Sequence, residues 1–149
     1  MVKAETSVVI NRPIEEVFDY LTDCTKNPAW LSMVLDAHWT SPEPHELGAT
    51  GVMTVRFLGR RFEMPFEVIE HGPPHRSAIK FSGGPFPIRG EYTFESAEGG
   101  TRVTSLTEGS TGGFFKLADS LLAPMFKRAM RADLANLKTL LEARAGRAA

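Results

Sequence analysis

Four histidines are the first candidates for acid–base or metal chemistry in this chain of 149 residues: His38, His45, His71 and His75. His71 and His75 flank a Gly-Pro-Pro sequence, which is typical of a turn, and a metal site would need further ligands on a rigid frame. His38 shares one face of a predicted strand with Asp36, and a catalytic histidine needs an orienting carboxylate of this kind. Such a pair also arises by chance, so the histidines predict no metal site.

Nucleophiles are equally scarce. Cys24 is the single cysteine, which excludes an internal disulfide and a cysteine-rich zinc site, and we interpret it as a partly buried bystander. No Gly-x-Ser-x-Gly elbow is present. The glycine pairs at 83–84, 99–100 and 112–113 indicate turns, and none has the spacing of a phosphate-binding loop. We therefore predict no catalytic residue, no metal ligand and no cofactor.

The composition of the chain argues against nucleic acid and the membrane interior as partners. The net charge is −1, with 42% hydrophobic and 23% charged residues, which is ordinary for a globular protein and offers no field that attracts nucleic acid. No apolar stretch reaches the roughly 18 residues that span a bilayer, and the N-terminus lacks a signal-peptide pattern. We expect a cytoplasmic monomer or homodimer, with no nucleic-acid partner and no integral membrane association.

The elements that must position any site begin with a strand over residues 3–10 and a helix starting at Ile14. Asn11 is predicted to cap this helix, and Pro13 suits its first turn. Residues 23–27 read as a break, and residues 28–33 as a second short helix.

Alternating residues then predict a series of strands joined by tight turns. The clearest alternation has Phe62, Met64, Phe66 and Val68 on one face, whereas the faces of the last strand cannot be assigned. The predicted strands cover residues 34–41, 51–58, 62–68, 77–82, 86–95 and 101–108.

A long helix is predicted from about residue 114 to 143, with a kink or break at Pro124. Its apolar stripe contains Met130, Leu134, Leu137 and Leu141, with Asp133 off the stripe. Only this helix is large enough to cover the apolar face of the sheet. The predicted fold is therefore α+β, with a curved antiparallel sheet of about six or seven strands around the C-terminal helix.

The apolar strand faces are either a packed core or the lining of a cavity. Flexible methionines favour an adaptable apolar surface, and a buried Tyr92 phenol needs a hydrogen-bond partner. Trp30 lies either at the pocket mouth or as a plug between helix and sheet. The residues predicted to line a ligand cavity are Trp30, Met33, Phe57, Phe62, Met64, Phe66, Phe81, Phe86, Ile88, Tyr92, Phe94, Leu121 and Met125.

Several segments together resemble a known family. They read SVVINRPIEEVFDYLTD, NPAWL, LGATGVMTVRFLGRRFEMPFEVIEHGPP, GEYTFESAEGGTRVT and KRAMRADLANLKTLLEAR. Their order and spacing resemble the START-like (SRPBCC) superfamily, and within it the bacterial polyketide cyclase/dehydrase family. The resemblance implies a helix-grip fold with a pocket between sheet and C-terminal helix. It supplies no catalytic motif that matches residue by residue. The chain length fits one domain, which we place at residues 1–145, and we expect a disordered tail at 146–149.

Proteins similar to this family bind lipids, polyketides, sterols or quinones, and some catalyse aromatic cyclisation. The leading hypothesis is a non-catalytic binder or carrier of a hydrophobic small molecule. The alternative is a polyketide aromatase/cyclase, for which Tyr92, His38 and Glu108 are the acid–base candidates. A second alternative is a protein-interaction module with a filled core and an exposed apolar patch.

Overall fold

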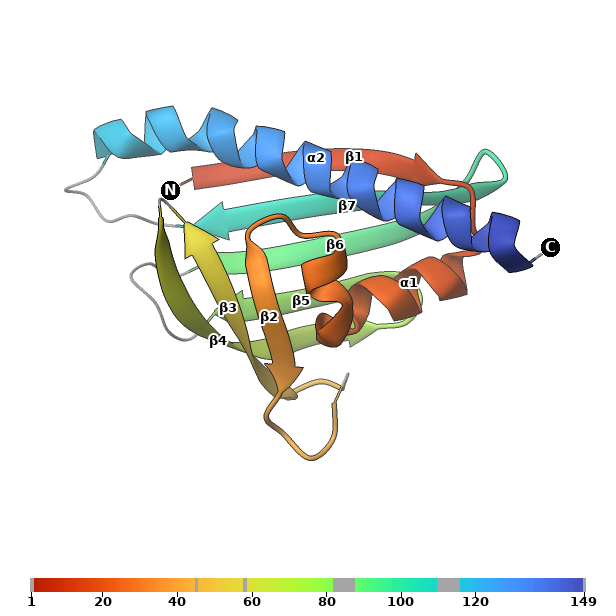
Figure 1. Ribbon diagram of the computed structural model, residues 1–149, viewed down its shortest axis with the longest axis horizontal. Coiled ribbons are helices and arrows are strands. Elements are labelled where there is room, and N and C mark those ends of the chain that lie inside the picture. The colour runs from red at the N-terminus through yellow and green to blue at the C-terminus, as the bar shows by residue number, and fades with distance from the viewer. Residues whose placement is uncertain (1, 45, 58, 82–87, 110–115, 149) are drawn as a thin grey trace.

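A computed structural model describes residues 2–44, 46–57, 59–81, 88–109 and 116–148. Seven strands, two α-helices and one 3₁₀-helix follow one another along the chain in these described ranges (Figure 1). They are β1 (Val2–Ile10), α1 (Ile14–Thr22), η1 (Cys24–Ala29), β2 (Val34–Trp39), β3 (Thr50–Phe57), β4 (Arg60–Gly72), β5 (Arg76–Phe81), β6 (Ile88–Ala97), β7 (Gly100–Gly109) and α2 (Lys116–Ala148).

The strands form one antiparallel sheet in the order β1-β7-β6-β5-β4-β3-β2. Short turns join β4 to β5 and β6 to β7, and the first strand pairs with the last, from Val2↔Gly109 to Ile10↔Thr101. Helix α2 lies across one face of this sheet and packs along β1 (Figure 1). The predicted α+β fold, with short helices after the first strand and a long C-terminal helix, is confirmed.

The C-terminal half of α2 contributes three buried leucines to the hydrophobic core. Leu134, Leu137 and Leu141 are at most 2% exposed and pack with Phe18 of α1 and Phe94 of β6. Burial of a leucine side chain contributes roughly 1.5–3 kcal/mol, so these contacts hold α2 against the sheet. The helix runs without a break through Pro124 and continues to Ala148, past the start of the predicted tail.

The segment between α1 and β2 differs from the prediction. The second short helix spans Cys24–Ala29, so it starts where the sequence indicated a break. The reason is Asp23, whose carboxylate Oδ1 accepts the Thr25 N–H at 3.1 Å and caps the first turn. This places Trp30 directly after the helix.

The predicted cap of α1 is also wrong. Pro13 occupies the N-cap position and makes no side-chain hydrogen bond to the helix. Asn11 instead donates its backbone N–H to Oε2 of Glu142, at 3.0 Å. The loop before α1 is therefore tied to the far end of α2.

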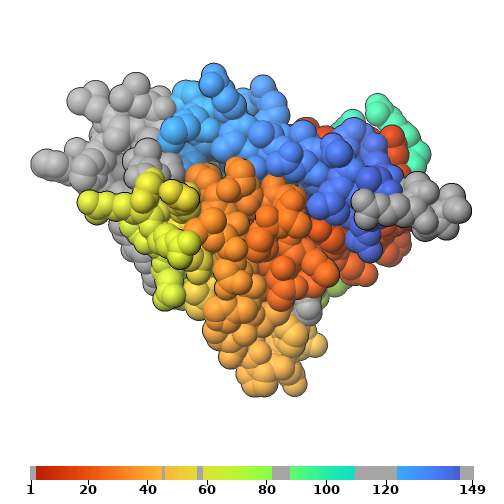
Figure 2. Space-filling model, viewed as in Figure 1, coloured from red at the N-terminus to blue at the C-terminus, as the bar shows by residue number. Residues whose placement is uncertain are grey.

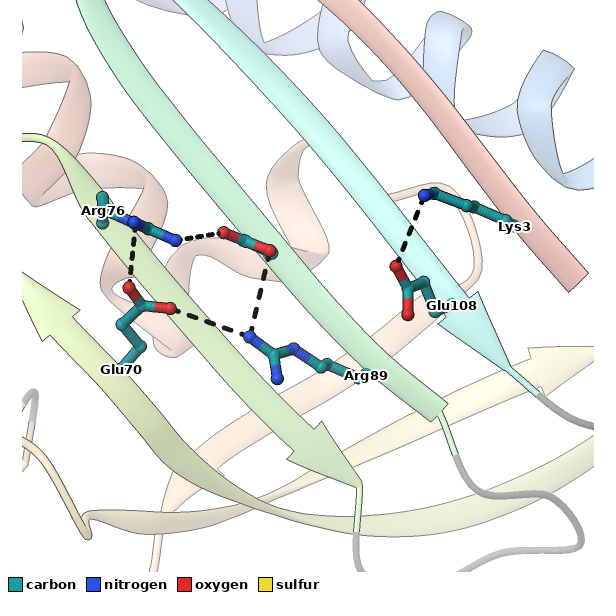
Figure 3. A network of polar contacts seen from close by, with 6 residues as sticks. Lys3, Glu70, Arg76, Arg89 and Glu108 are labelled. Carbon is teal, nitrogen blue, oxygen red and sulfur yellow. Dashed lines mark hydrogen bonds and ion pairs between the residues drawn. The ribbon is translucent and has the colours of Figure 1, made fainter. Parts of the chain in front are cut away.

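Ionised side chains of the central strands form a network on the face of the sheet away from the helices (Figure 3). Arg76 contacts Glu70 and Glu91 at 2.8 Å each, and Arg89 reaches the same two carboxylates at 3.7 and 3.9 Å. Exposed pairs of this kind contribute about 0–1 kcal/mol each. These charges thus cover the outer face and leave the inner face to apolar and hydroxyl side chains.

Candidate functional site

A pocket of about 680 Å³ lies between the sheet and α2. That volume is within the range of about 300–1,000 Å³ that accommodates small-molecule ligands. Its walls come from both short helices, all seven strands and the middle of α2. Every helix and strand of the described chain therefore contributes to enclosing the same space.

One face of α2 passes from pocket wall to core. Phe126, Ala129, Met130 and Asp133 line the pocket, and their spacing of three, one and three residues puts them on one helix face. Leu134 follows immediately and belongs to the buried core. The inner end of the pocket is therefore at Asp133, where the core begins.

Aromatic and methionine side chains form the wall on β3 and β4. Met53 pairs with Met64, and Gly51 pairs with Phe66. A Cβ atom at Gly51 would lie 2.5 Å from Cζ of Phe66, so the glycine lets this ring pack directly on the strand. The centroids of the Phe66 and Trp39 rings are 5.7 Å apart, and the rings meet edge to face, a geometry that aromatic pairs prefer.

The missing side chain of Gly90 explains in part why the pocket between the sheet and α2 is not filled. Gly90 on β6 lies between Ile79 and Thr107 in the sheet, and all three line the pocket. A Cβ atom at Gly90 would meet only Cγ1 of Ile79, at an ordinary 3.9 Å. The pocket thus exists in part because this position has no side chain.

The η1–β2 segment closes one side of the pocket. Figure 2 shows this segment in orange against α2 in blue. The Ser32 N–H donates to Oδ1 of Asp133 at 3.1 Å, and the Asn136 side-chain amide donates to the Trp30 carbonyl at 3.4 Å. These bonds fix Trp30 and Asp133 near one another at the inner end.

Four lining residues form what we call the inner polar cluster: Trp30, which directly follows η1, Tyr92 on β6, Ser105 on β7 and Asp133 on α2. Tyr92 and Ser105 are register partners on β6 and β7, and the Tyr92 ring lies 6.3 Å from the Trp30 ring. Burial raises the pKa of Tyr92 to about 12; its hydrogen bond with Ser105 opposes this and the nearby Asp133 adds to it. The phenol therefore keeps its proton at neutral pH.

Asp133 is 5% exposed. Burial raises the pKa of its carboxyl group, and hydrogen bonds from Ser32 oppose that rise. The sequence pattern placed Asp133 off the apolar stripe of the helix, and the structure corrects this prediction because the side chain is buried in the pocket wall. The cost of burying it is offset by the Ser32 N–H, which the sequence pattern does not reveal.

The single thiol also lines the pocket. Cys24 is 3% exposed, and burial raises its pKa to about 12, with contributions from Asp23 and Asp36. A thiol in this state is a weak nucleophile. Cys24 therefore acts as an apolar wall residue.

The residues predicted to line the cavity divide into three groups. Those that line the pocket are Trp30, Met33, Phe62, Met64, Phe66, Phe81, Ile88 and Tyr92. Phe94 packs in the core against Phe18, with ring centroids 5.1 Å apart, and Met125 is 42% exposed and outside the lining. Phe86 and the side chains of Phe57 and Leu121 lie outside the described residues. For all thirteen residues, contact with a ligand stays a prediction.

The lining residues that sequence reasoning missed lie on strand or helix faces that it left unassigned, assigned to the core or judged polar. On α2, the spacing of Phe126 and Met130 was the available signal. On β7, no apolar alternation marked the inner face. The missed residues include Trp39, Met53, Ser105, Thr107, Phe126, Met130 and Asp133.

The other acid–base candidates face away from the pocket. His38 is exposed, with its Nδ1 3.4 Å from Asp36, and Glu108 lies 3.9 Å from Lys3 on the sheet surface (Figure 3). Within the described ranges, no three His, Cys, Asp or Glu side chains are grouped to hold a metal ion. Nor is any helix in that part of the chain long and apolar enough to span a membrane.

Solved structures share this architecture. A protein from Thermus thermophilus superposes with a TM-score of 0.80 at 17% identity, over 95% of this chain and 98% of that one. The di-domain ARO/CYC StfQ from the steffimycin biosynthetic pathway gives a TM-score of 0.79 at 14% identity, over 97% of this chain and 52% of that one. At these identities the likeness concerns the fold.

Sequence relatives include uncharacterised mycobacterial proteins. Proteins of this kind from Mycobacterium tuberculosis and Mycobacterium bovis are 28% identical over 136 residues, which is 87% of this chain and 78% of theirs. The family model for polyketide cyclase/dehydrase and lipid transport matches residues 1–142. The chain therefore belongs to the polyketide cyclase/dehydrase and lipid transport family.

Proposed function

We propose that this protein binds or carries a hydrophobic small molecule, such as a lipid, a polyketide or a quinone-like compound, without transforming it. The observation that carries the proposal is the pocket of about 680 Å³ between the sheet and α2, with its wall of aromatic and methionine side chains. Ligand sites are concave, mostly apolar and furnished with a few placed polar groups. The family's description, which includes lipid transport, supports the same function.

An aromatase/cyclase activity is the second candidate, favoured by Tyr92 and Asp133 in the pocket lining. Such chemistry needs an acid–base group within hydrogen-bond reach of the substrate. Tyr92, with a pKa raised to about 12, donates hydrogen bonds but is a poor base at neutral pH. The activity would therefore depend on Asp133, and an Asp133→Asn variant that turned over a polyketide substrate as fast as the wild type would exclude it.

The interaction-module alternative predicted a core without ligand-sized space. A pocket above roughly 300 Å³ counts against it.

The test uses the two tryptophans of the chain. Trp30 and Trp39 are the only ones, and both line the pocket. N-phenyl-1-naphthylamine is a neutral apolar dye that accepts energy from tryptophan. We expect saturable one-to-one quenching of tryptophan emission, and displacement of the dye by long-chain lipids or aromatic polyketides.

A matched pair of variants supplies the control. Gly90→Leu puts a side chain into the pocket, whereas Gly72→Leu adds the same atoms at an exposed position with no contact closer than 3.7 Å. Dye binding should fall at least tenfold in the first variant and stay unchanged in the second. Equal binding by both variants would show that the dye lies elsewhere and would refute the proposal.

A further inference from the structure

Arg60 is a cation on the inner face of β4, where the pocket reaches the surface. Side chains alternate between the two faces of a strand, and the register of β4 with β3 is regular from Arg60 onward. Arg60 therefore shares its face with Phe62, Met64 and Phe66, which line the pocket. Arg60 lines the same pocket and is exposed, so the pocket meets solvent beside a guanidinium group.

This cation has no carboxylate partner in the described ranges, where the ion pairs all involve other residues. Further exposed cations surround it. Arg56 and Arg61 are register partners on the outer face of the same hairpin, and Lys127 and Arg128 are exposed on the first half of α2, which lies at the same end of the molecule (Figure 1). Clustered charges of one sign raise the local concentration of the opposite ion, so this end attracts anions.

The other end of the pocket has the opposite charge. Asp133 is the remaining charged residue of the described lining, and it lies near Tyr92. The row of Tyr92 across the sheet meets β4 at His71, at the other end of that strand from Arg60. A second negative charge beside Asp133 would be repelled strongly in a low dielectric. The pocket is therefore polarised along its length.

A guanidinium group binds carboxylates and phosphates through two parallel N–H···O hydrogen bonds. We propose that the hydrophobic ligand ends in an anionic head group, a carboxylate or a phosphate, which pairs with Arg60 at the mouth while its apolar chain extends inward along Phe62, Met64 and Phe66. This rests on the proposed function and deepens it, because it names the chemical class of the ligand and its orientation.

The test compares four probes that share one alkyl chain: decanoate, decyl phosphate, 1-decanol and decylammonium, each kept below the concentration at which it forms micelles. Their affinities for the full chain are measured by displacement of N-phenyl-1-naphthylamine at low ionic strength. We expect the anions to bind most tightly and decylammonium most weakly. A preference for only one of the anions would assign the carboxylate or the phosphate. Binding of decanol or decylammonium as tight as that of both anions would overturn the inference.

A matched pair of variants locates the effect. Arg102 pairs with Glu95 at 3.4 Å and lies at the other end of β7 from the lining residue Gly109. Arg60→Gln and Arg102→Gln each remove one positive charge, but only the first removes it at the pocket. Arg60→Gln should lower the preference for an anion over decanol about 2- to 5-fold, the effect of one partly exposed ion pair, and Arg102→Gln should not. Equal preferences in both variants and the wild type would overturn the inference.

Salt dependence and NMR give independent readouts. Near 1 M salt, where the Debye length is about 3 Å, the wild type should lose the part of the preference that Arg60→Gln removes. In protein labelled with ¹⁵N-arginine, the Nε–H signal that is absent from Arg60→Gln should shift with decanoate and decyl phosphate but not with decanol. An Arg60 signal that responds to neither anion would contradict the proposed pairing.

Asp133→Asn tests the orientation of the ligand. It should raise the affinity for decanoate less than threefold, because the head group lies at the far end from Asp133. A larger rise would place the head group at the inner end and overturn the inference. If neither the dye nor any probe binds, the proposed function fails. If the dye and the probes bind without any dependence on Arg60, only the present inference fails.

Discussion

Replacement of Gly90 by leucine should make the protein more stable and less able to bind its ligand. The Cβ atom at this position meets a single atom, Cγ1 of Ile79, at 3.9 Å, and the residue lines the pocket. Because Gly90 has no positive φ among the backbone angles of the described chain, a side chain causes no strain there. The space is thus available to a larger residue.

The size of the effect follows from three contributions. Removing a glycine from a strand interior gains about 0.5–1 kcal/mol. A leucine that contacts one pocket wall gains about half of the roughly 1.5–3 kcal/mol of full burial, and it loses about 0.5–1 kcal/mol of side-chain entropy. The net stabilisation of the ligand-free protein is about 1 kcal/mol, which raises Tm by about 2–4 °C.

The assay is urea unfolding of ligand-free protein, followed by circular dichroism, for the wild type, Gly90→Ala, Gly90→Leu and Gly72→Leu. Gly90→Ala should gain about 0.5–1 kcal/mol with little loss of dye binding, and Gly90→Leu should gain stability but lose dye binding. A loss of about 2 kcal/mol or more in Gly90→Leu, the cost typical of an overpacked core, would mean that side chains already fill this space. That result would refute the reasoning.

Three further predictions concern the scaffold and use the same unfolding assay. Gly100→Ala should destabilise the protein by at least about 1 kcal/mol, since its Cβ would lie 2.2 Å from the carbonyl oxygen of Ile10; an unchanged midpoint would contradict this contact. Leu137→Ala should cost about 2–5 kcal/mol because Leu137 is 0% exposed in the core, and a cost below about 1 kcal/mol would show a loosely packed helix. The pKa of Glu142 is lowered from its ordinary 4.5, first by the Asn11 N–H, so its stabilisation is present above about pH 4.5 and is lost as the pH falls toward the lowered value. Glu142→Gln should therefore lose less stability than the wild type between about pH 7 and pH 3.5, and identical pH profiles would exclude this role.

The sheet was predictable where one face of a strand is consistently apolar. On β4, Phe62, Met64, Phe66 and Val68 alternate with charged residues and one proline. In the structure, Met64, Phe66 and Val68 are buried. On β7 the buried residues include Thr101 and Ser105. Polarity there carries no information about the face, because these hydroxyls lie on the inner side under α2.

The site was only partly predictable for a related reason. Asp133 lies off the apolar stripe of α2 by periodicity, and its burial depends on the N–H of Ser32, a residue remote in sequence. The volume of the pocket depends on an absent side chain at Gly90. Sequence periodicity detects the residues that fill a core, and it does not measure the space that they leave.

Native mass spectrometry of the protein purified from its own cells tests the central claim most directly. The wild type and the exposed control Gly72→Leu should carry one bound apolar molecule, and Gly90→Leu should be largely empty. A wild-type protein that carries no small molecule from its cells, and that neither binds the dye nor any member of a lipid and polyketide panel, would contradict the account.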